Sequence, residues 1–170
     1  KKLKGIVVTA SRKNADDCLA SAEALKAANK EVMVNIRENG LTGGGLRALG
    51  TASLVNVINS VGSLPTRNWQ ESYYEKAEDI SGEALAEKYL VKAGACHRCP
   101  IACGRVVRVG DKVVGGPEYE PLWAYGANMD NNDLASINEA NMWCNEYGLD
   151  AISVPCTIAA AMELYQRGAI

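Results

Sequence analysis

Three cysteines stand within eight residues of the sequence, Cys96, Cys99 and Cys103, in the order Cys-x2-Cys-x3-Cys. Pro100 follows the second cysteine and Gly104 follows the third. An iron–sulfur cluster needs thiolates that converge from a sharply bent chain, and proline and glycine favour such a bend. The spacing therefore predicts an iron–sulfur site for which this loop supplies three of the four cysteines of a cubane cluster.

Zinc is the competing metal, because it would accept three thiolates together with His97, the one histidine of the chain. His97 adjoins Cys96, however, whereas zinc ligands usually come as two spaced pairs, so zinc ranks second. Structural cysteines in a packed loop rank third, since the turn chemistry argues against a core role. Beside a cluster, His97 could move protons or donate a hydrogen bond to a sulfur and so tune the potential.

The other three cysteines lie on predicted helices. Cys18 and Cys144 are interpreted as small buried core residues. Cys156 stands at the start of a helix, where the helix dipole would favour a thiolate.

Two carboxylates, Glu118 and Glu120, flank Tyr119. In an extended segment they would point to the same side, and paired carboxylates near a metal can share or relay protons. The alternative is that both side chains are solvated acids in a loop, and spacing alone favours this alternative.

Composition restricts the class of protein. The chain has 170 residues, enough for one domain, with 18 basic and 20 acidic side chains and no charged run. This balance argues against a nucleic-acid or membrane-surface partner, and no apolar stretch approaches the length of a bilayer span. Three of the six cysteines are clustered, which indicates metal rather than a secreted disulfide scaffold, so we expect a cytoplasmic protein. Because the sequence starts without Met and stops just after a helical pattern, we expect a piece of a larger redox enzyme.

The elements that must position these residues are mainly helical, and the fold class predicted is mainly α with a small β hairpin. Residues 3–9 are predicted to form a short buried strand, residues 106–109 and 112–114 a hairpin around Gly110-Asp111, and glycines 43–45 a flexible linker. Apolar spacing and capping residues predict helices over residues 14–29, 46–61, 82–92, about 133–148 and 156–167.

The cysteine loop, residues 96–105, resembles the cluster loop of the tungsten-dependent aldehyde:ferredoxin oxidoreductases. Five further segments resemble the same family in the same order: residues 50–52, 64–68, 81–86, 116–120 and 148–153. Each segment alone is weak evidence for the family, but five segments in register are specific evidence. Together they span most of the chain from Gly50 to Gly168.

The resemblance implies a multihelical domain of the type found in the C-terminal part of that family. Residues 1–15 would be the tail of an N-terminal β domain that binds the pterin, and residues 16–170 a truncated helical second domain. The fourth cluster cysteine of the family lies in a later domain and is missing here. We therefore expect the isolated chain to bind a cluster poorly and to be inactive alone.

The implied reaction is oxidation of aldehydes to carboxylic acids at a tungsten (or molybdenum) bis-pterin, with a 4Fe–4S cluster passing electrons singly to ferredoxin. Glu120 matches the glutamate that assists proton transfer, with Glu118 beside it. The segment that would border the pterin comprises Asn145, Gly148, Leu149 and Asp150. Asn145 replaces the aspartate of the family motif and so lacks the charge that would pair with an amino-pterin edge.

Three further interpretations follow from the resemblance. Glu139 matches a residue that helps bind a single iron between two subunits, which would make a homodimer, although an exposed helix position explains it equally well. His97 and Cys156 make the benzoyl-CoA-reductase type of the same family a second candidate. The alternative from another class is a non-catalytic iron–sulfur or zinc-binding electron-transfer module.

Overall fold

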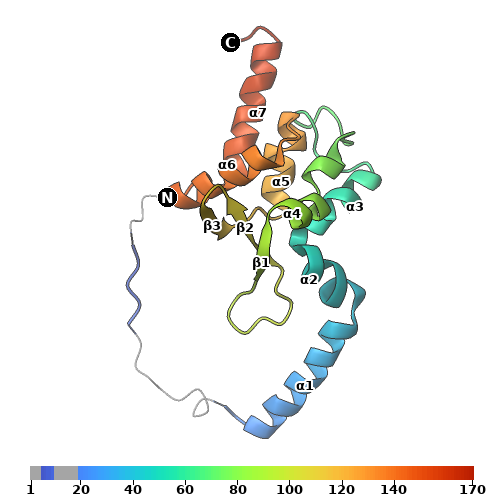
Figure 1. The fold of residues 1–170 in the computed structure, drawn as a ribbon, viewed down its shortest axis with the longest axis vertical. Coiled ribbons are helices and arrows are strands. Elements are labelled where there is room, and N and C mark those ends of the chain that lie inside the picture. Colours follow the sequence, from blue (N-terminus) through green and yellow to red (C-terminus); the bar gives the residue numbers. More distant parts are fainter. Residues whose placement is uncertain (1–4, 10–18) are drawn as a thin grey trace.

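The computed structural model describes residues 5–9 and 19–170, and it is mainly helical with one small antiparallel sheet, as predicted (Figure 1). The helices are α1 (Ala22–Glu38), α2 (Leu46–Leu49), α3 (Leu54–Ser60), α4 (Gly82–Lys88), α5 (Tyr119–Tyr125), α6 (Leu134–Tyr147) and α7 (Ser153–Gln166). Shorter helical turns are η2 (Gly40–Gly45), η3 (Gly50–Ser53), η4 (Ala77–Ile80) and η5 (Ala127–Met129).

The sheet has the order β1 (Leu90–Gly94), β2 (Gly104–Val109) and β3 (Lys112–Gly115). The predicted hairpin is β2–β3, and Gly110 supplies the positive φ of its turn, +57°. β1 was not predicted: the helix expected to reach Lys92 ends at Lys88, because the next residues pair with β2. The cysteine loop therefore connects two neighbouring strands.

The core lies between the sheet and helices α3 to α6. Its largest fully buried side chains include Tyr74, Leu85, Leu122 and Ile137. Helix α5 was also missed by sequence analysis, because all five residues from Pro121 to Tyr125 are buried and the run shows no polar face. Glu118 is extended, with φ of −89° and ψ of −173°, but Tyr119 and Glu120 are the first residues of α5, so the expected extended conformation is wrong for these two.

The first two predicted helices have different limits in the structure. Asn14 lies outside the described residues; α1 begins after Ser21, whose hydroxyl accepts from the Ala24 N–H at 3.2 Å, and ends at Glu38. The helix predicted over residues 46–61 is interrupted at Gly50, whose φ of +69° is not helical. The flexible linker expected at residues 43–45 is instead part of the helical turn η2.

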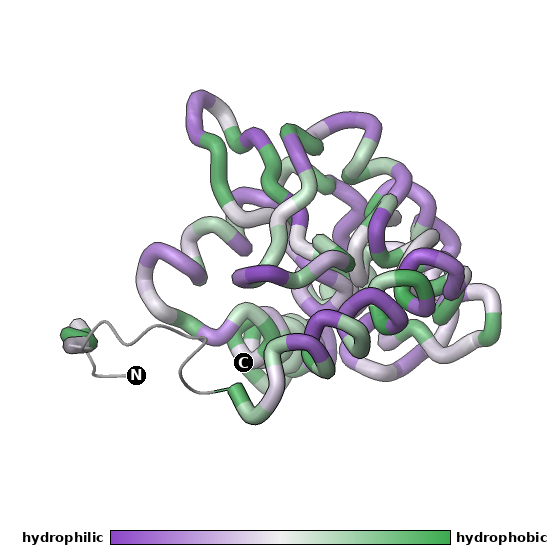
Figure 2. The backbone as a smooth tube through the Cα atoms, turned by 90° about the horizontal axis from the view of Figure 1, so that it is seen from below, coloured by the Kyte–Doolittle hydropathy of each residue, from purple (hydrophilic) through white to green (hydrophobic). Residues whose placement is uncertain are grey.

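The N-terminal strand prediction is wrong for the part that is described. Residues 5–9 form no strand, and Val7 and Val8 are 91% and 83% exposed. A strand without a partner is not stable, and the described residues supply none. Figure 2 shows this hydrophobic stretch set apart from the folded body. The proposed boundary after residue 15 and the burial of Cys18 fall in residues that are not described.

The last two helices follow their predicted signals closely. Asp133 caps α6 by accepting from the Ala135 N–H at 3.0 Å, and Gly148 ends α6 with a left-handed φ of +64°. Helix α7 begins at Ser153, three residues before the predicted start at Cys156. Within the described residues, no helix is both long and apolar enough to cross a membrane.

Candidate functional site

The cysteine loop and the Gly116–Glu120 segment leave the sheet at the same end. Gly104, the first residue of β2, pairs with Gly94 at the end of β1, and Val106 pairs with Gly115 at the end of β3. The Gly116 N–H then donates to the Arg105 carbonyl at 2.8 Å. The predicted metal loop and the predicted catalytic carboxylates are therefore attached to the same end of one sheet.

The loop itself is a tight, partly exposed turn. The Cys99 N–H donates to the Cys96 carbonyl at 3.0 Å, and Arg98 and Ala102 have positive φ values of 57° and 55°. Cys96 is exposed and Cys99 and Cys103 are partly buried. In the described part of the chain, no group of three or more His, Cys, Asp or Glu side chains is arranged to hold a metal ion, so the cluster ligands remain a prediction.

Gly50 lies directly against the closing end of this loop. A β-carbon at position 50 would lie 2.4 Å from the carbonyl oxygen of Cys103 and 3.1 Å from Nε of Arg105. The next residue, Thr51, accepts from the Tyr119 N–H at 3.0 Å through its hydroxyl. Residues 50 and 51 thus contact both the cysteine loop and the start of α5, which fixes one relative to the other.

Arg105 joins the same loop to α2. Its guanidinium donates to the carbonyls of Ala48 (2.7 Å), Arg47 (3.3 Å) and Ala102, and the residue is only 4% exposed. Burial lowers its pKa, and a Cys103 thiolate nearby opposes that effect. Three thiols that form no disulfide, on a loop closed beside a buried cation, fit the chemistry of an anionic iron–sulfur cluster.

A hollow between α5 and the α6–α7 turn gathers four of the predicted site residues. It is lined by Glu118 and Glu120 from the start of α5, Asn145 from the end of α6, and Asp150 from the following turn. Gly115 and Gly116, at the end of the sheet described above, also line it. We call this the carboxylate hollow. Residues 32 positions apart in sequence meet there, as the resemblance implies.

Glu120 has a fixed orientation within the carboxylate hollow. Its Oε2 accepts from the Trp123 Nε1–H at 2.6 Å, one helical turn later. The Trp123 ring is almost fully buried and lies edge-on against Trp69, with ring centroids 5.6 Å apart. The bond leaves the second carboxylate oxygen, Oε1, without a hydrogen bond to any described residue.

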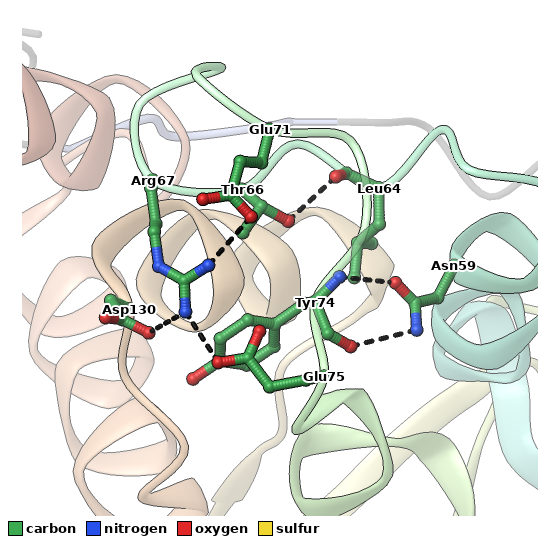
Figure 3. A network of polar contacts seen from close by, with 8 residues as sticks. All are labelled: Asn59, Leu64, Thr66, Arg67, Glu71, Tyr74, Glu75 and Asp130. Atoms are coloured by element: carbon green, nitrogen blue, oxygen red, sulfur yellow. Dashed lines mark hydrogen bonds and ion pairs between the residues drawn. The ribbon is translucent and has the colours of Figure 1, made fainter.

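A polar network around Arg67 holds the turn that carries Trp69 (Figure 3). Arg67, Asn68 and Trp69 all have positive φ, between 49° and 59°, which is costly for residues with side chains. Figure 3 shows the Arg67 guanidinium between three carboxylates, those of Glu71 (2.8 Å), Glu75 (2.6 Å) and Asp130 (3.2 Å). These ion pairs raise the pKa of Arg67 and fix the turn.

The turn between α6 and α7 has well-defined caps at both ends. The Leu149 N–H donates to the Cys144 carbonyl at 2.8 Å, which makes Gly148 and Leu149 part of a Schellman motif. Asp150 Oδ1 accepts from the N–H groups of Ile152 (2.9 Å) and Ser153 (2.7 Å) at the start of α7. Gly148 and Leu149 are exposed on this turn beside the carboxylate hollow rather than in its wall.

The cysteines of the last two helices differ from each other. Cys144 is buried, as predicted, and its Sγ lies 3.0 Å from the Tyr125 hydroxyl. Cys156 does not have the thiolate character that its helix position suggested. Burial raises its pKa, and the charge of Asp150 raises it further.

Two predicted site residues lie outside the carboxylate hollow. His97 is exposed on the cysteine loop. Glu139 is exposed on α6, where it accepts from the Trp143 Nε1–H at 3.3 Å and borders a different hollow beside the hairpin turn. Neither lies beside Glu120 in this structure.

Sequence analysis missed the positioning residues: Gly50, Thr51, Arg105 and Trp123. The first three stand inside segments recognised only as resemblances. Trp123 could have been found, because it follows Glu120 by three residues, the spacing of neighbours on one helix face.

This chain is similar in sequence to proteins of a known family. The family model described as aldehyde ferredoxin oxidoreductase, domains 2 and 3, matches residues 27–170. A tungsten-containing aldehyde ferredoxin oxidoreductase of Thermococcus kodakarensis is 48% identical over 99% of this chain, and one of Pyrococcus furiosus is 47% identical over all of it. The chain spans 27% and 28% of the lengths of these two relatives. The WOR-like subunit of an aliphatic sulfonate oxidoreductase from Pyrococcus furiosus is 33% identical over 62% of this chain, which spans 18% of that protein.

Proposed function

Because this chain belongs to the aldehyde ferredoxin oxidoreductase family, we propose that it forms the cluster-binding and pterin-bordering part of a tungsten enzyme that oxidises aldehydes to carboxylic acids and passes the electrons to ferredoxin. The names of the relatives support the tungsten, the aldehyde and the ferredoxin of this proposal.

The carboxylate hollow is the observation that carries this proposal. Its wall combines a carboxylate oriented by an indole N–H, at Glu120, with the amide of Asn145 and the capped turn at Asp150. It is bordered by the two glycines that lead back to the cysteine loop. A proton-transfer group, polar groups for a flat heterocycle and an electron-transfer loop are thus adjacent.

The tungsten bis-pterin, when bound, supplies the two-electron chemistry. Glu120 holds a proton at Oε1 while Trp123 keeps Oε2 in place. Glu118 is the second carboxylate of the hollow and exchanges protons with solvent. Asn145 would donate and accept hydrogen bonds at the edge of a bound pterin, and the turn of Gly148, Leu149 and Asp150 would border the same edge.

The cysteine loop would hold the 4Fe–4S cluster through Cys96, Cys99 and Cys103, with a fourth thiolate from outside these residues. The loop continues directly into β2, whose neighbour β3 leads into the carboxylate hollow. This continuity supports placing the residues that would hold the cluster and the residues that would border the pterin at the same end of one sheet, and ferredoxin would be the acceptor of the electrons.

The remaining assignments are proposals of the same kind. Residues 1–15 would belong to the β domain that binds the pterin and residues 16–170 to the helical second domain, and Glu139 would contribute to an iron site between two subunits. Molybdenum is the alternative metal at the pterin. Among the relatives compared, no name favours the benzoyl-CoA-reductase type or a non-catalytic zinc or electron-transfer module.

The test is the variant Glu120→Gln in the full-length protein. We expect turnover to fall by about a hundredfold or more, because the proton-transfer group is lost. Iron and tungsten contents and the visible absorption of the cluster should not change. Glu118→Gln should lose less activity, since no indole orients Glu118, and Glu87→Gln, an exposed glutamate on α4, should match the parent. Full activity of Glu120→Gln, or loss of metal with activity, would contradict the assignment.

A further inference from the structure

Arg105 is a buried cation without a carboxylate partner among the described residues. Arg67, which pairs with three acids, is the ordinary case of a paired arginine. The guanidinium of Arg105 instead donates only to backbone carbonyls, those of Gly104, Ala48, Arg47 and Ala102. Those bonds satisfy its N–H groups, but they do not neutralise its charge.

An uncompensated buried charge is strongly destabilising, so such residues are normally paired with an opposite charge or neutralised. Arginine keeps its proton in proteins, which excludes neutralisation. Two of its hydrogen bonds, to the carbonyls of Ala102 and Gly104, hold the guanidinium against the closing end of the cysteine loop, where these residues flank Cys103. An anionic cluster held by this loop would supply the negative charge that the described residues do not.

The same side chain determines where the loop closes. It bonds to Ala102 inside the loop and to Ala48 at the end of α2, 57 residues from Arg105. Gly50 leaves room for the guanidinium, since a β-carbon there would be 3.1 Å from its Nε. Only a planar fork with several donors can bond to both segments together.

We propose that Arg105 is the positioning residue of the iron–sulfur cluster: it fixes the closing end of the cysteine loop to α2, and its charge favours the reduced state of the cluster. This inference rests on the proposed function, which assigns the cluster to this loop. A cluster held by thiolates is anionic, and reduction adds one more negative charge. A fixed neighbouring positive charge stabilises the reduced form more than the oxidised form and so raises the reduction potential.

The experiment is a redox titration of the full-length, cluster-containing protein, followed by electron paramagnetic resonance of the reduced cluster. Arg105→Gln removes the charge and should lower the equilibrium constant for reduction by about tenfold, a shift of about 59 mV for a one-electron couple. Arg105→Lys keeps the charge but cannot bond to both segments. It should retain the parent potential but lose iron faster to a chelator. Arg108→Gln removes an exposed charge from the same strand and should match the parent in both measurements.

Each outcome either supports or overturns the proposed role of Arg105. An Arg105→Gln potential equal to that of Arg108→Gln would overturn it, and so would equal potentials for Arg105→Lys and Arg105→Gln, because charge would then not be the cause. If circular dichroism shows that Arg105→Gln is not folded, Arg105→Lys decides: unchanged iron loss overturns the inference, and faster loss at the parent potential supports it. A parent protein without iron and sulfide contradicts the proposed function itself, before any variant is compared.

Discussion

Replacing Gly50 with alanine tests the contact between the cysteine loop and the helical core. Gly50 has φ of +69° and ψ of −161°, a region that residues with a β-carbon essentially never adopt. The added β-carbon would also lie 2.4 Å from the Cys103 carbonyl oxygen, a backbone atom that cannot rotate away. Either the turn at Gly50 or the end of the cysteine loop must move.

The expected cost is about 3 kcal/mol, the upper part of the range for one residue forced into such a conformation. For a domain of this size, that corresponds to a fall in melting temperature of about 6–12 °C. The matched control is Gly45→Ala, five residues earlier. Gly45 has helical φ and ψ of −54° and −50°, and its nearest neighbour would be the Ser53 hydroxyl at 3.8 Å. This variant should gain about 0.4–1 kcal/mol.

The assay is thermal and urea unfolding followed by circular dichroism, with parent and both variants in one buffer. Opposite signs for the two glycines are the expected result. A change of less than about 0.5 kcal/mol for Gly50→Ala would refute the reasoning, because neither strain nor contact would then be present. Equal losses for Gly50→Ala and Gly45→Ala would refute it too, since any β-carbon in this segment would be harmful.

Two other side chains give predictions that need separate assays. Trp123→Phe keeps the buried ring but removes the donor to Glu120, and we expect turnover to fall about tenfold with melting temperature nearly unchanged, whereas Trp143→Phe should leave turnover at the parent value. Equal activity of both would show that Glu120 needs no indole. Asp150→Asn keeps an acceptor for the cap of α7 but removes the charge that raises the pKa of Cys156. In this variant, the rate at which iodoacetamide alkylates Cys156, read by peptide mass spectrometry, should therefore rise at pH 8. The rise should be less than about tenfold, because burial, the larger cause of the raised pKa, remains. An unchanged or lower rate would contradict the assigned cause.

Elements with local signals could be predicted from the sequence, and elements created by packing could not. Asp133 and Gly148 mark the ends of α6 in the sequence itself, and Gly110-Asp111 marks the hairpin. Helix α5 has no such signal, because both its faces are buried. β1 depends on pairing with β2, and the break at Gly50 depends on the closeness of Cys103, a residue 53 positions away.

The features of the candidate site also divide into those with a signal in the sequence and those created by packing. Residue types and spacing predict that the cysteine loop holds a metal cluster, and the resemblance predicts the roles of Glu120 and Asn145. The orientation of Glu120 by Trp123, and the donation by Arg105 to Ala48, are tertiary facts that no local pattern carries. The expected thiolate character of Cys156 is wrong for a tertiary reason too, because burial, and after it the charge of Asp150, raise the pKa of this thiol.

The most direct test of the account is elemental analysis of the full-length protein, purified without oxygen. We predict tungsten or molybdenum together with about four irons and matching acid-labile sulfide per chain. In the variant Cys99→Ser, iron should fall while the fold persists. Stoichiometric zinc with no iron would contradict the account, because the cysteine loop would then be a zinc site and the carboxylate hollow would have no redox partner.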